Sequence, residues 1–346
     1  MSTTKMTETT SIESSNKQSS ANMTVCRICE NSDHNITHEV REMMLGLRTL
    51  HSYFECADCG CLQITEVPDN IQSFYPSDDY YSYDKVKAVS GIKGFLIKKR
   101  DRYAATGSCL LGKIMQRFQP HDKLPSLLYA NVKLDSKILD VGCGAAHLLH
   151  AMKEAGFKNL LGIDPFNNED INYDNGLKIE KKSIHDLTLN HESGDWDLIM
   201  FNHSFEHVFD QHDVLEKVFE LLKPGGVCMI RIPTVTSWAW RSYGVDWVQL
   251  DAPRHFFLHS IRSMQLLADQ TGLNLDDVVY DSFAFQSWGS IQYQHDIALQ
   301  DENSYAVNPD KSRFNAEDIR EFEEHSKELN RTKSGDQAAF YLKKPA

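Results

Sequence analysis

Two acidic residues and a glycine-rich turn give the strongest chemical signal in the sequence. Asp140 precedes the turn Gly142-Cys143-Gly144, which joins a short apolar stretch to a stretch with a helical pattern. The two glycines let the backbone approach a ligand, whose polar groups can meet unpaired amides at a helix start. Asp164 ends the next apolar stretch, where an open α/β sheet binds the ribose hydroxyls of a nucleotide. The sequence therefore predicts a site for an adenosine-containing cofactor.

Position 147 discriminates between two such cofactors. A dinucleotide site of the G-x-G-x-x-G type has a third glycine three residues after the second, and this sequence has His147 there. The carboxylate of Asp140 is also unfavourable beside a charged pyrophosphate. It suits a ligand with an ammonium and a sulfonium group, and S-adenosylmethionine is such a ligand.

Four motifs, in this order and spacing, resemble those of the class I S-adenosylmethionine-dependent methyltransferases. They are Asp140-Val-Gly-Cys-Gly144, Asp164, Ser204-Phe-Glu-His-Val208 and Leu222-Lys-Pro-Gly-Gly226. The resemblance covers residues 134–275 and 337–343. It implies an α/β fold with a Rossmann-like, seven-stranded methyltransferase sheet. The last strand, expected at Gln337–Leu342, would be antiparallel and distinguishes this sheet from a dinucleotide-binding one.

The resemblance implies further cofactor contacts. Ile184 and His185 lie where residues of the family flank the adenine ring. Asn202 and His203 follow the fourth expected strand, Trp196–Phe201. The carboxyl end of a central strand lines the ligand crevice of an open α/β sheet. Position, more than residue type, makes these two residues candidates.

Two histidines are candidates for the base that takes a proton from an alcohol acceptor. A positioned histidine typically contributes about 10²- to 10⁴-fold to the rate. We expect His255 to be this base, with His207 as the second choice. The four-residue spacing of His203 and His207 resembles that of metal ligands, but the sequence offers no third ligand with a matching signature. Glu206 can equally be a carboxylate that complements a helix dipole.

An aromatic and polar segment follows the fifth expected strand. It contains Trp247 and a cluster of Asp251, Arg254 and His255. Part of the resembled family, including many bacterial glycan-pathway enzymes, carries a Trp, Asp-x-Pro-x-His stretch on its acceptor side. Rings can stack on a pyranose and polar groups can bind its hydroxyls, so we expect Trp247, Asp251 and Arg254 to bind the acceptor. The alternative is that the aromatic residues form the edge of the core and Arg254 pairs with Asp251.

Two C-x-x-C pairs predict a structural zinc site. Cys26 and Cys29 form the first pair, and Cys56 and Cys59 follow after 26 residues. The alternatives are two disulfides, which a reducing compartment disfavours, or free core cysteines. Zinc would here be a folding element, because four thiolates leave no open position for water. Cys61 follows the knuckle glycine and is expected to lie outside the site.

Composition and charge limit the other classes of function that are possible for this protein. With 346 residues and 41% apolar content, the chain can bury one large core and a smaller module. No apolar run reaches membrane-spanning length and no signal-peptide pattern is present, which predicts a cytoplasmic protein. A formal charge of −13 argues against a nucleic-acid partner.

The segment 85–137 departs from this acidic balance, with 12 Lys/Arg against 3 Asp/Glu. Helices with apolar and basic faces are expected at 94–103 and 110–118. The segment allows an anionic acceptor or a peripheral contact with acidic lipid headgroups. The alternative is a solvated face on a helical cap.

Four parts are expected along the chain: a disordered tail (1–22), a zinc-ribbon-like module with a tyrosine-rich connector (23–83), the basic helical cap (84–133), and the methyltransferase domain (134–346) with an insertion at about 301–334. The leading functional hypothesis is O-methylation of a sugar, a glycan precursor or a related small molecule. One alternative is C-methylation of a keto-sugar nucleotide, since some such enzymes pair a cysteine-rich zinc module with this fold. Another is a catalytically silent zinc-ribbon scaffold.

Overall fold

The computed structural model describes residues 24–75, 91–121, 123–188 and 195–346. The expected disordered tail and most of the tyrosine-rich connector therefore lie outside the described residues. No helix within these ranges combines the length and the apolar character needed to span a membrane.

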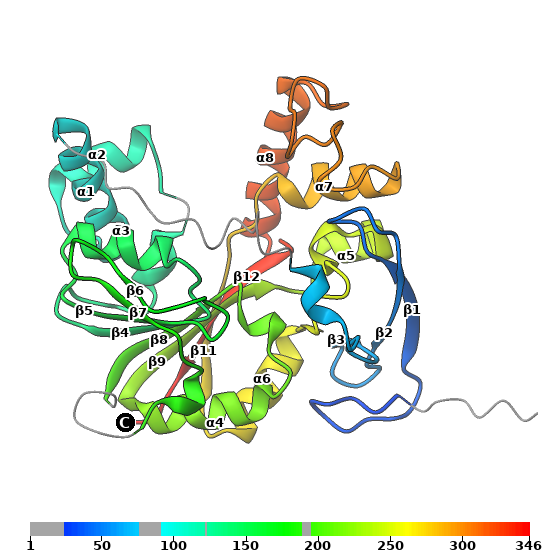
Figure 1. Ribbon diagram of the computed structural model, residues 1–346, viewed down its shortest axis with the longest axis horizontal. Coiled ribbons are helices and arrows are strands. Elements are labelled where there is room, and N and C mark those ends of the chain that lie inside the picture. The colour runs from blue at the N-terminus through cyan, green and yellow to red at the C-terminus, as the bar shows by residue number, and fades with distance from the viewer. Residues whose placement is uncertain (1–23, 76–90, 122, 189–194) are drawn as a thin grey trace, which may run out of the picture.

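An eight-stranded sheet lies at the centre of the molecule (Figure 1), with the strand order β11-β12-β9-β8-β4-β5-β7-β6. Its strands are β4 (Lys137–Val141), β5 (Asn159–Ile163), β6 (Ile171–Asn172), β7 (Lys178–Glu180), β8 (Trp196–Asn202), β9 (Leu222–Pro233), β11 (Asn274–Tyr280) and β12 (Gln337–Lys343). From β9 to β7 the neighbours pair in parallel, whereas β12 pairs antiparallel with both β9 and β11. The expected antiparallel last strand is confirmed, and the short β6 adds one strand to the seven expected.

Helices cover both faces of this sheet, which is why its central strands are almost wholly apolar (Figure 1). One face carries α1 (Gly91–Thr106), α2 (Leu110–Phe118) and α3 (His147–Ala155), and the other carries α4 (Gln211–Leu221) and α6 (Ile261–Gln270). The first cap helix does not bury its large apolar side chains. Instead, α1 buries Gly94, Ala104 and Ala105 and leaves Ile92 and Phe95 exposed.

A second sheet has the order β1-β2-β3-β10. Its strands are β1 (Ile36–Arg41), β2 (Leu50–Glu55), β3 (Leu62–Ile64) and β10 (Phe257–Leu258). Because β10 belongs to the methyltransferase part of the sequence, the two parts share a sheet. The Tyr53 hydroxyl adds to this connection by donating to the carbonyl of His255 at 2.9 Å.

Three more helices complete the fold: α5 (Trp238–Tyr243), α7 (Phe285–Gln294) and α8 (Ala316–Arg331). The start of α8 is set by a capping box. The Asn315 side chain accepts from the amides of Glu317 and Asp318, and Asp318 accepts from the amide of Asn315.

Candidate cofactor and acceptor site

The glycine turn lies at the carboxyl end of β4 and contacts the segment after β8. Gly142 has φ +71°, and a Cβ atom there would be 2.6 Å from Cβ of Ser204. Only glycine therefore fits without a shift, and the Ser204 hydroxyl donates to the carbonyl of Val141 at 2.7 Å. The turn and the residues after β8 form one continuous edge of the sheet.

Asp164 ties the turn to the end of β5. Its two oxygens accept from the amide of Gly144 at 2.8 Å and from the amide of Phe166 at 2.9 Å. Each carboxylate oxygen has a second lone pair, so the side chain can still accept from ribose hydroxyls. Burial raises the pKa of Asp164, although the backbone amides act in the opposite direction.

Asp140 lies beside this acid and is 3% exposed. Burial, together with the charge of Asp164, raises the pKa of Asp140 to about 8. A cationic group bound here would favour the carboxylate form. The two acids and the glycine turn thus fit a ligand with an ammonium group at one end and a ribose at the other.

The residues that we expect to contact the adenine ring, and Cys143 of the turn, lie at the same edge of the sheet. Ile184 is buried in a short 3-10 turn after β7, and His185 is half exposed, with its Nε2 atom 3.4 Å from Asp210. Cys143 packs against β5, because a Cβ atom on Gly162 would be 2.7 Å from its sulfur. Their contact with cofactor remains a prediction.

Arg231 of β9 was not identified from the sequence. It donates from Nη1 to Asn202 Oδ1 at 3.2 Å and to His203 Nε2 at 2.8 Å, and from Nε to Asp281 at 2.5 Å. The sequence could have pointed to this residue, because it is a single charged side chain within the apolar run of β9. Asn202 and His203 are thus held by this buried arginine, and a role in cofactor binding remains a prediction.

Glu206 is fully buried, and neither of its carboxylate oxygens has a hydrogen-bond partner among the described residues. Its Oε1 atom lies 3.5 Å from His203 Nδ1 and 3.9 Å from His255 Nε2. Burial alone would raise the pKa of Glu206, but the contact with His203 and the neighbouring His207 and His255 outweigh it and lower the pKa to about 2. The centre of this cluster is therefore a buried negative charge.

The hydrogen bonds of His255 and His207 define their tautomers. His255 Nδ1 is 2.8 Å from the carbonyl of Gln249, and His207 Nδ1 is 2.9 Å from that of Arg254 and 3.1 Å from the Tyr75 hydroxyl. Because a carbonyl oxygen only accepts, Nδ1 of each ring carries the hydrogen. Each Nε2 then has a lone pair that can take a proton.

Glu206, His207 and His255 form a group that could hold a metal ion and that the sequence did not single out, and His203 is not part of it. Ligand atoms of Glu206, His207 and His255 lie within 4.8 Å of one another. The sequence could not reveal this group because His255 reaches it from a distant segment. In this arrangement the three side chains can share a proton or surround a cation.

The acceptor residues are placed differently from the expectation. Trp247 is 0% exposed and donates from Nε1 to Asp336 at 2.9 Å, so its ring offers no surface for stacking. Arg254 is also enclosed and forms a two-point ion pair with Asp251. The alternative interpretation of this segment, core packing with an internal ion pair, describes the geometry. The pair instead fixes the backbone next to His255.

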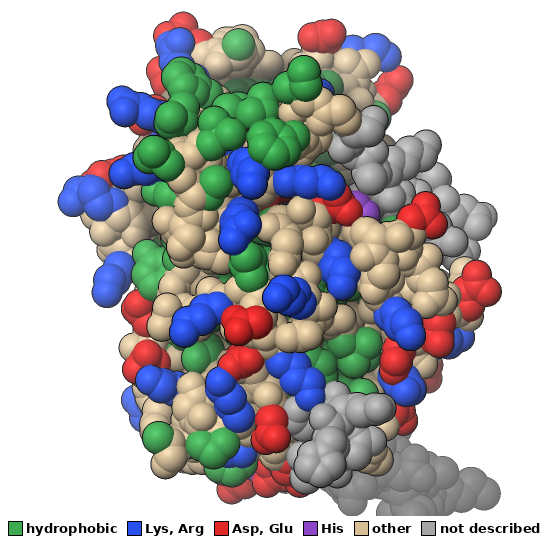
Figure 2. Space-filling model, turned by 90° about the vertical axis from the view of Figure 1, so that its left-hand side faces the viewer, with side chains coloured by type: hydrophobic (Ala, Val, Ile, Leu, Met, Phe, Trp, Pro, Cys, Tyr) green, Lys and Arg blue, Asp and Glu red, His purple; other side chains and the backbone are tan. Residues whose placement is uncertain are grey.

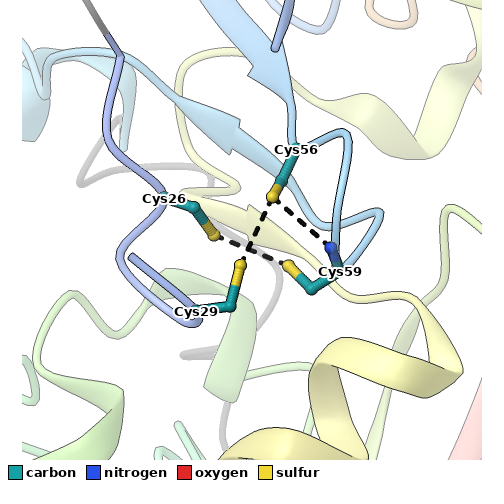
Figure 3. A group of neighbouring side chains, drawn as sticks. All are labelled: Cys26, Cys29, Cys56 and Cys59. Atoms are coloured by element: carbon teal, nitrogen blue, oxygen red, sulfur yellow. Dashed lines mark hydrogen bonds between the residues drawn. The ribbon is translucent and has the colours of Figure 1, made fainter. Parts of the chain in front are cut away.

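The four predicted zinc ligands come together from two turns and point toward a common centre (Figure 3). The sulfurs of Cys26 and Cys59, and those of Cys29 and Cys56, are 3.5 Å apart, and every cysteine is free. Tetrahedral zinc with bonds of 2.3 Å separates its sulfurs by about 3.8 Å. The cluster can therefore hold zinc, while Cys61 lies outside it.

The strand order and the glycine turn define a class I methyltransferase fold. A family model described as "Methyltransferase domain" matches residues 103–278, just over half of the chain. The chain therefore belongs to this family. It contains a methyltransferase domain of the S-adenosylmethionine-dependent class, and it spans 61% of the length of a curated relative described below.

Curated relatives include two proteins named "Ubiquinone biosynthesis O-methyltransferase". The one from Psychrobacter arcticus is 29% identical over 41% of this chain and 61% of its own length. The one from Haemophilus ducreyi is 30% identical over 43% of this chain and 70% of its own length. A solved S-adenosylmethionine-dependent methyltransferase from Mesorhizobium loti is 15% identical, with a TM-score of 0.41 over 65% of this chain and 98% of its own.

Proposed function

We propose that this enzyme transfers a methyl group to a hydroxyl oxygen of a small-molecule acceptor. The observation that carries the proposal is the cluster of two histidines, each with Nδ1 bonded to a backbone carbonyl, around the buried carboxylate of Glu206. Ser204, two residues before Glu206, contacts the glycine turn at Gly142. Proton-accepting groups therefore lie close to the proposed cofactor site.

The cofactor is assigned to the acidic edge of the sheet. When bound, S-adenosylmethionine supplies an electrophilic methyl group. We assign its ammonium group to Asp140, its ribose hydroxyls to Asp164, and its adenine to the surroundings of Ile184 and His185. The turn Gly142-Cys143-Gly144 would let the backbone approach it closely. These residues hold the cofactor in place, and alignment of the two reacting groups contributes much of the rate.

The acceptor hydroxyl loses its proton to Nε2 of His255, or of His207 as the second choice. Gln249 fixes the tautomer of His255 by accepting from Nδ1. The buried charge of Glu206, 3.9 Å from Nε2, stabilises the imidazolium that forms. Burial lowers the pKa of His207, which keeps that ring neutral before the reaction.

The relatives' names favour O-methylation and an intermediate of ubiquinone biosynthesis as the acceptor class. A sugar or glycan precursor is the second class, but the enclosed ring of Trp247 removes one argument for it. The cysteine cluster keeps C-methylation of a keto-sugar nucleotide as an alternative reaction. Membership of the methyltransferase family argues against a silent scaffold.

Labelled S-adenosylmethionine with a panel of acceptors tests the proposal. Catechols and other phenols represent the first class, and nucleotide-sugars represent the second. Product spectra distinguish an O-methyl from a C-methyl group, and solvent deuterium exchange at an acceptor carbon would indicate C-methylation. Transfer to a hydroxyl, lost in His255→Asn, supports the proposal. Transfer to carbon, or full turnover in that variant, overturns it.

A further inference from the structure

The two cap helices present large apolar side chains to solvent. Ile92 of α1 is 82% exposed and Phe118 of α2 is 80% exposed, and Phe95, Leu110 and Ile114 are exposed as well. Figure 2 shows hydrophobic side chains gathered at the top of this face, where α1 and α2 lie, with Lys and Arg side chains around them. This apolar area is contiguous rather than a scatter of single residues.

The packing of the hairpin explains why these side chains face outward. The helices meet at Gly112, where a Cβ atom would be 2.0 Å from the carbonyl oxygen of Lys99 and 2.6 Å from Cβ of Tyr103. On its inner side, α1 buries the small residues Ala104 and Ala105. The larger apolar residues are left on the outside. A groove of about 250 Å³ runs between the helices, with Ile92, Lys93, Leu96, Ile97, Arg100, Met115 and Gln119 as its lining.

The two cap helices carry a strong positive charge. Residues 91–118 contain seven Lys/Arg and one acid, a net charge of +6, so the rest of a chain with −13 carries −19. The single acid, Asp101, is buried and paired with Arg100 at 2.7 Å. Lys98 pairs with Glu154 at 2.6 Å. The other five cations form no ion pair within the described residues; they are Lys93, Lys99, Arg102, Lys113 and Arg117.

We propose that α1 and α2 form a docking surface for an anionic lipid bilayer. The exposed apolar side chains enter the boundary between headgroups and acyl chains, and the Lys and Arg side chains contact lipid phosphates. Charge complementarity selects this occupant, because α1 and α2 combine apolar area with cations and residues 91–118 include no exposed acid. The acidic remainder of the protein is repelled by the same bilayer, which fixes one orientation.

Vesicle co-sedimentation of the full-length, zinc-loaded protein tests this surface without measuring methyl transfer. Vesicles of phosphatidylcholine alone are compared with vesicles that also contain phosphatidylglycerol. We expect binding to the anionic vesicles that weakens with salt. Each basic residue near the bilayer contributes about fivefold to partitioning, so loss of three should weaken binding about a hundredfold, and the triple charge reversal should weaken it by more than that. That variant carries Lys93→Glu, Lys113→Glu and Arg117→Glu.

Matched controls lie in the segment between α7 and β12. Lys311→Glu, Lys327→Glu and Lys333→Glu reverse three charges there and should leave binding within about twofold. Phe118→Ser should weaken binding, whereas Val307→Ser, which replaces a side chain that is 55% exposed, should not. Circular dichroism checks that each variant folds.

Two results would overturn the proposal. One is a folded wild type that does not bind anionic vesicles at low salt. The other is a wild type that dimerises in solution and becomes monomeric in Phe118→Ser, because the face would then be covered by a second copy of the chain.

Discussion

Gln63 of β3 pairs with Phe257 of β10, and its side chain donates to the sulfur of Cys26 at 2.8 Å. One residue therefore contacts both the cysteine cluster and the strand that follows His255. The position of the candidate base is thus coupled to the metal-binding module through a shared sheet.

Loss of a zinc ligand should therefore disable methyl transfer as well as the module. We expect Cys56→Ser to lose zinc and to lower the free energy of unfolding by about 4 kcal/mol or more, as loss of a metal site can. Elemental analysis, thermal unfolding and turnover are measured on one preparation. Cys109→Ser, outside the cluster, should retain all three properties. Loss of zinc with full turnover would refute the coupling.

Asp164 should dominate cofactor affinity. A hydrogen bond to a charged group contributes about 1.5–3 kcal/mol, so Asp164→Ala should weaken binding of S-adenosylhomocysteine by about tenfold to more than a hundredfold. Calorimetric titration measures the effect, and Asp174→Asn on an exposed acid nearby serves as the control. If Asp164→Ala bound S-adenosylhomocysteine with unchanged affinity, the assignment of the ribose hydroxyls to Asp164 would be wrong.

The raised pKa of Asp140 makes cofactor binding depend on pH. Because this pKa is about 8, the free protein holds a proton at pH 7 that the ligand's ammonium group must displace. Affinity for S-adenosylhomocysteine should rise by about tenfold from pH 7 to pH 9 and then level off. Calorimetry in buffers of different ionisation enthalpy should detect proton release. Asp140→Asn should abolish both effects, and their persistence would assign them to another group.

The same group gives a stability prediction with a definite sign. The folded-state pKa of Asp140 lies above the ordinary value of 3.8, so the native protein binds more protons than the unfolded chain between these two values. The stability of the ligand-free protein should therefore fall as the pH rises from about 4 to about 8. Thermal unfolding of Asp140→Asn should show a smaller fall over this range, and equal slopes would contradict the assignment.

The sequence predicted the parts of this protein that local pattern determines. The apolar run of β8 and the glycine turn each carry their structural signal within a few residues. The helix α7 was missed because its interior contains Gly289 and a mixture of serine and glutamine without an amphipathic period. Local pattern was thus sufficient for the sheet but not for this helix.

The environment of Glu206 could not be predicted for a different reason. Its burial depends on His255, which is brought near by the pairing of β10 with β3. Likewise, Trp247 is enclosed because it reaches Asp336 at the start of the last strand. These contacts join distant segments, and a single sequence contains no signal for them.

Glu206→Gln should lower both activity and stability. The substitution keeps the shape of the side chain and removes a buried charge that has no hydrogen-bond partner among the described residues. Because the neighbouring histidines outweigh the cost of burial and lower the pKa of Glu206 to about 2, the charged form stabilises the fold, and the melting temperature should fall. Turnover should fall by about tenfold or more, because the imidazolium of His255 loses one of its two nearby carboxylates and keeps only that of Asp251. Glu317→Gln on the exposed start of α8 is the control for both measurements. A lower melting temperature with unchanged turnover would mean that Glu206 has a structural role only.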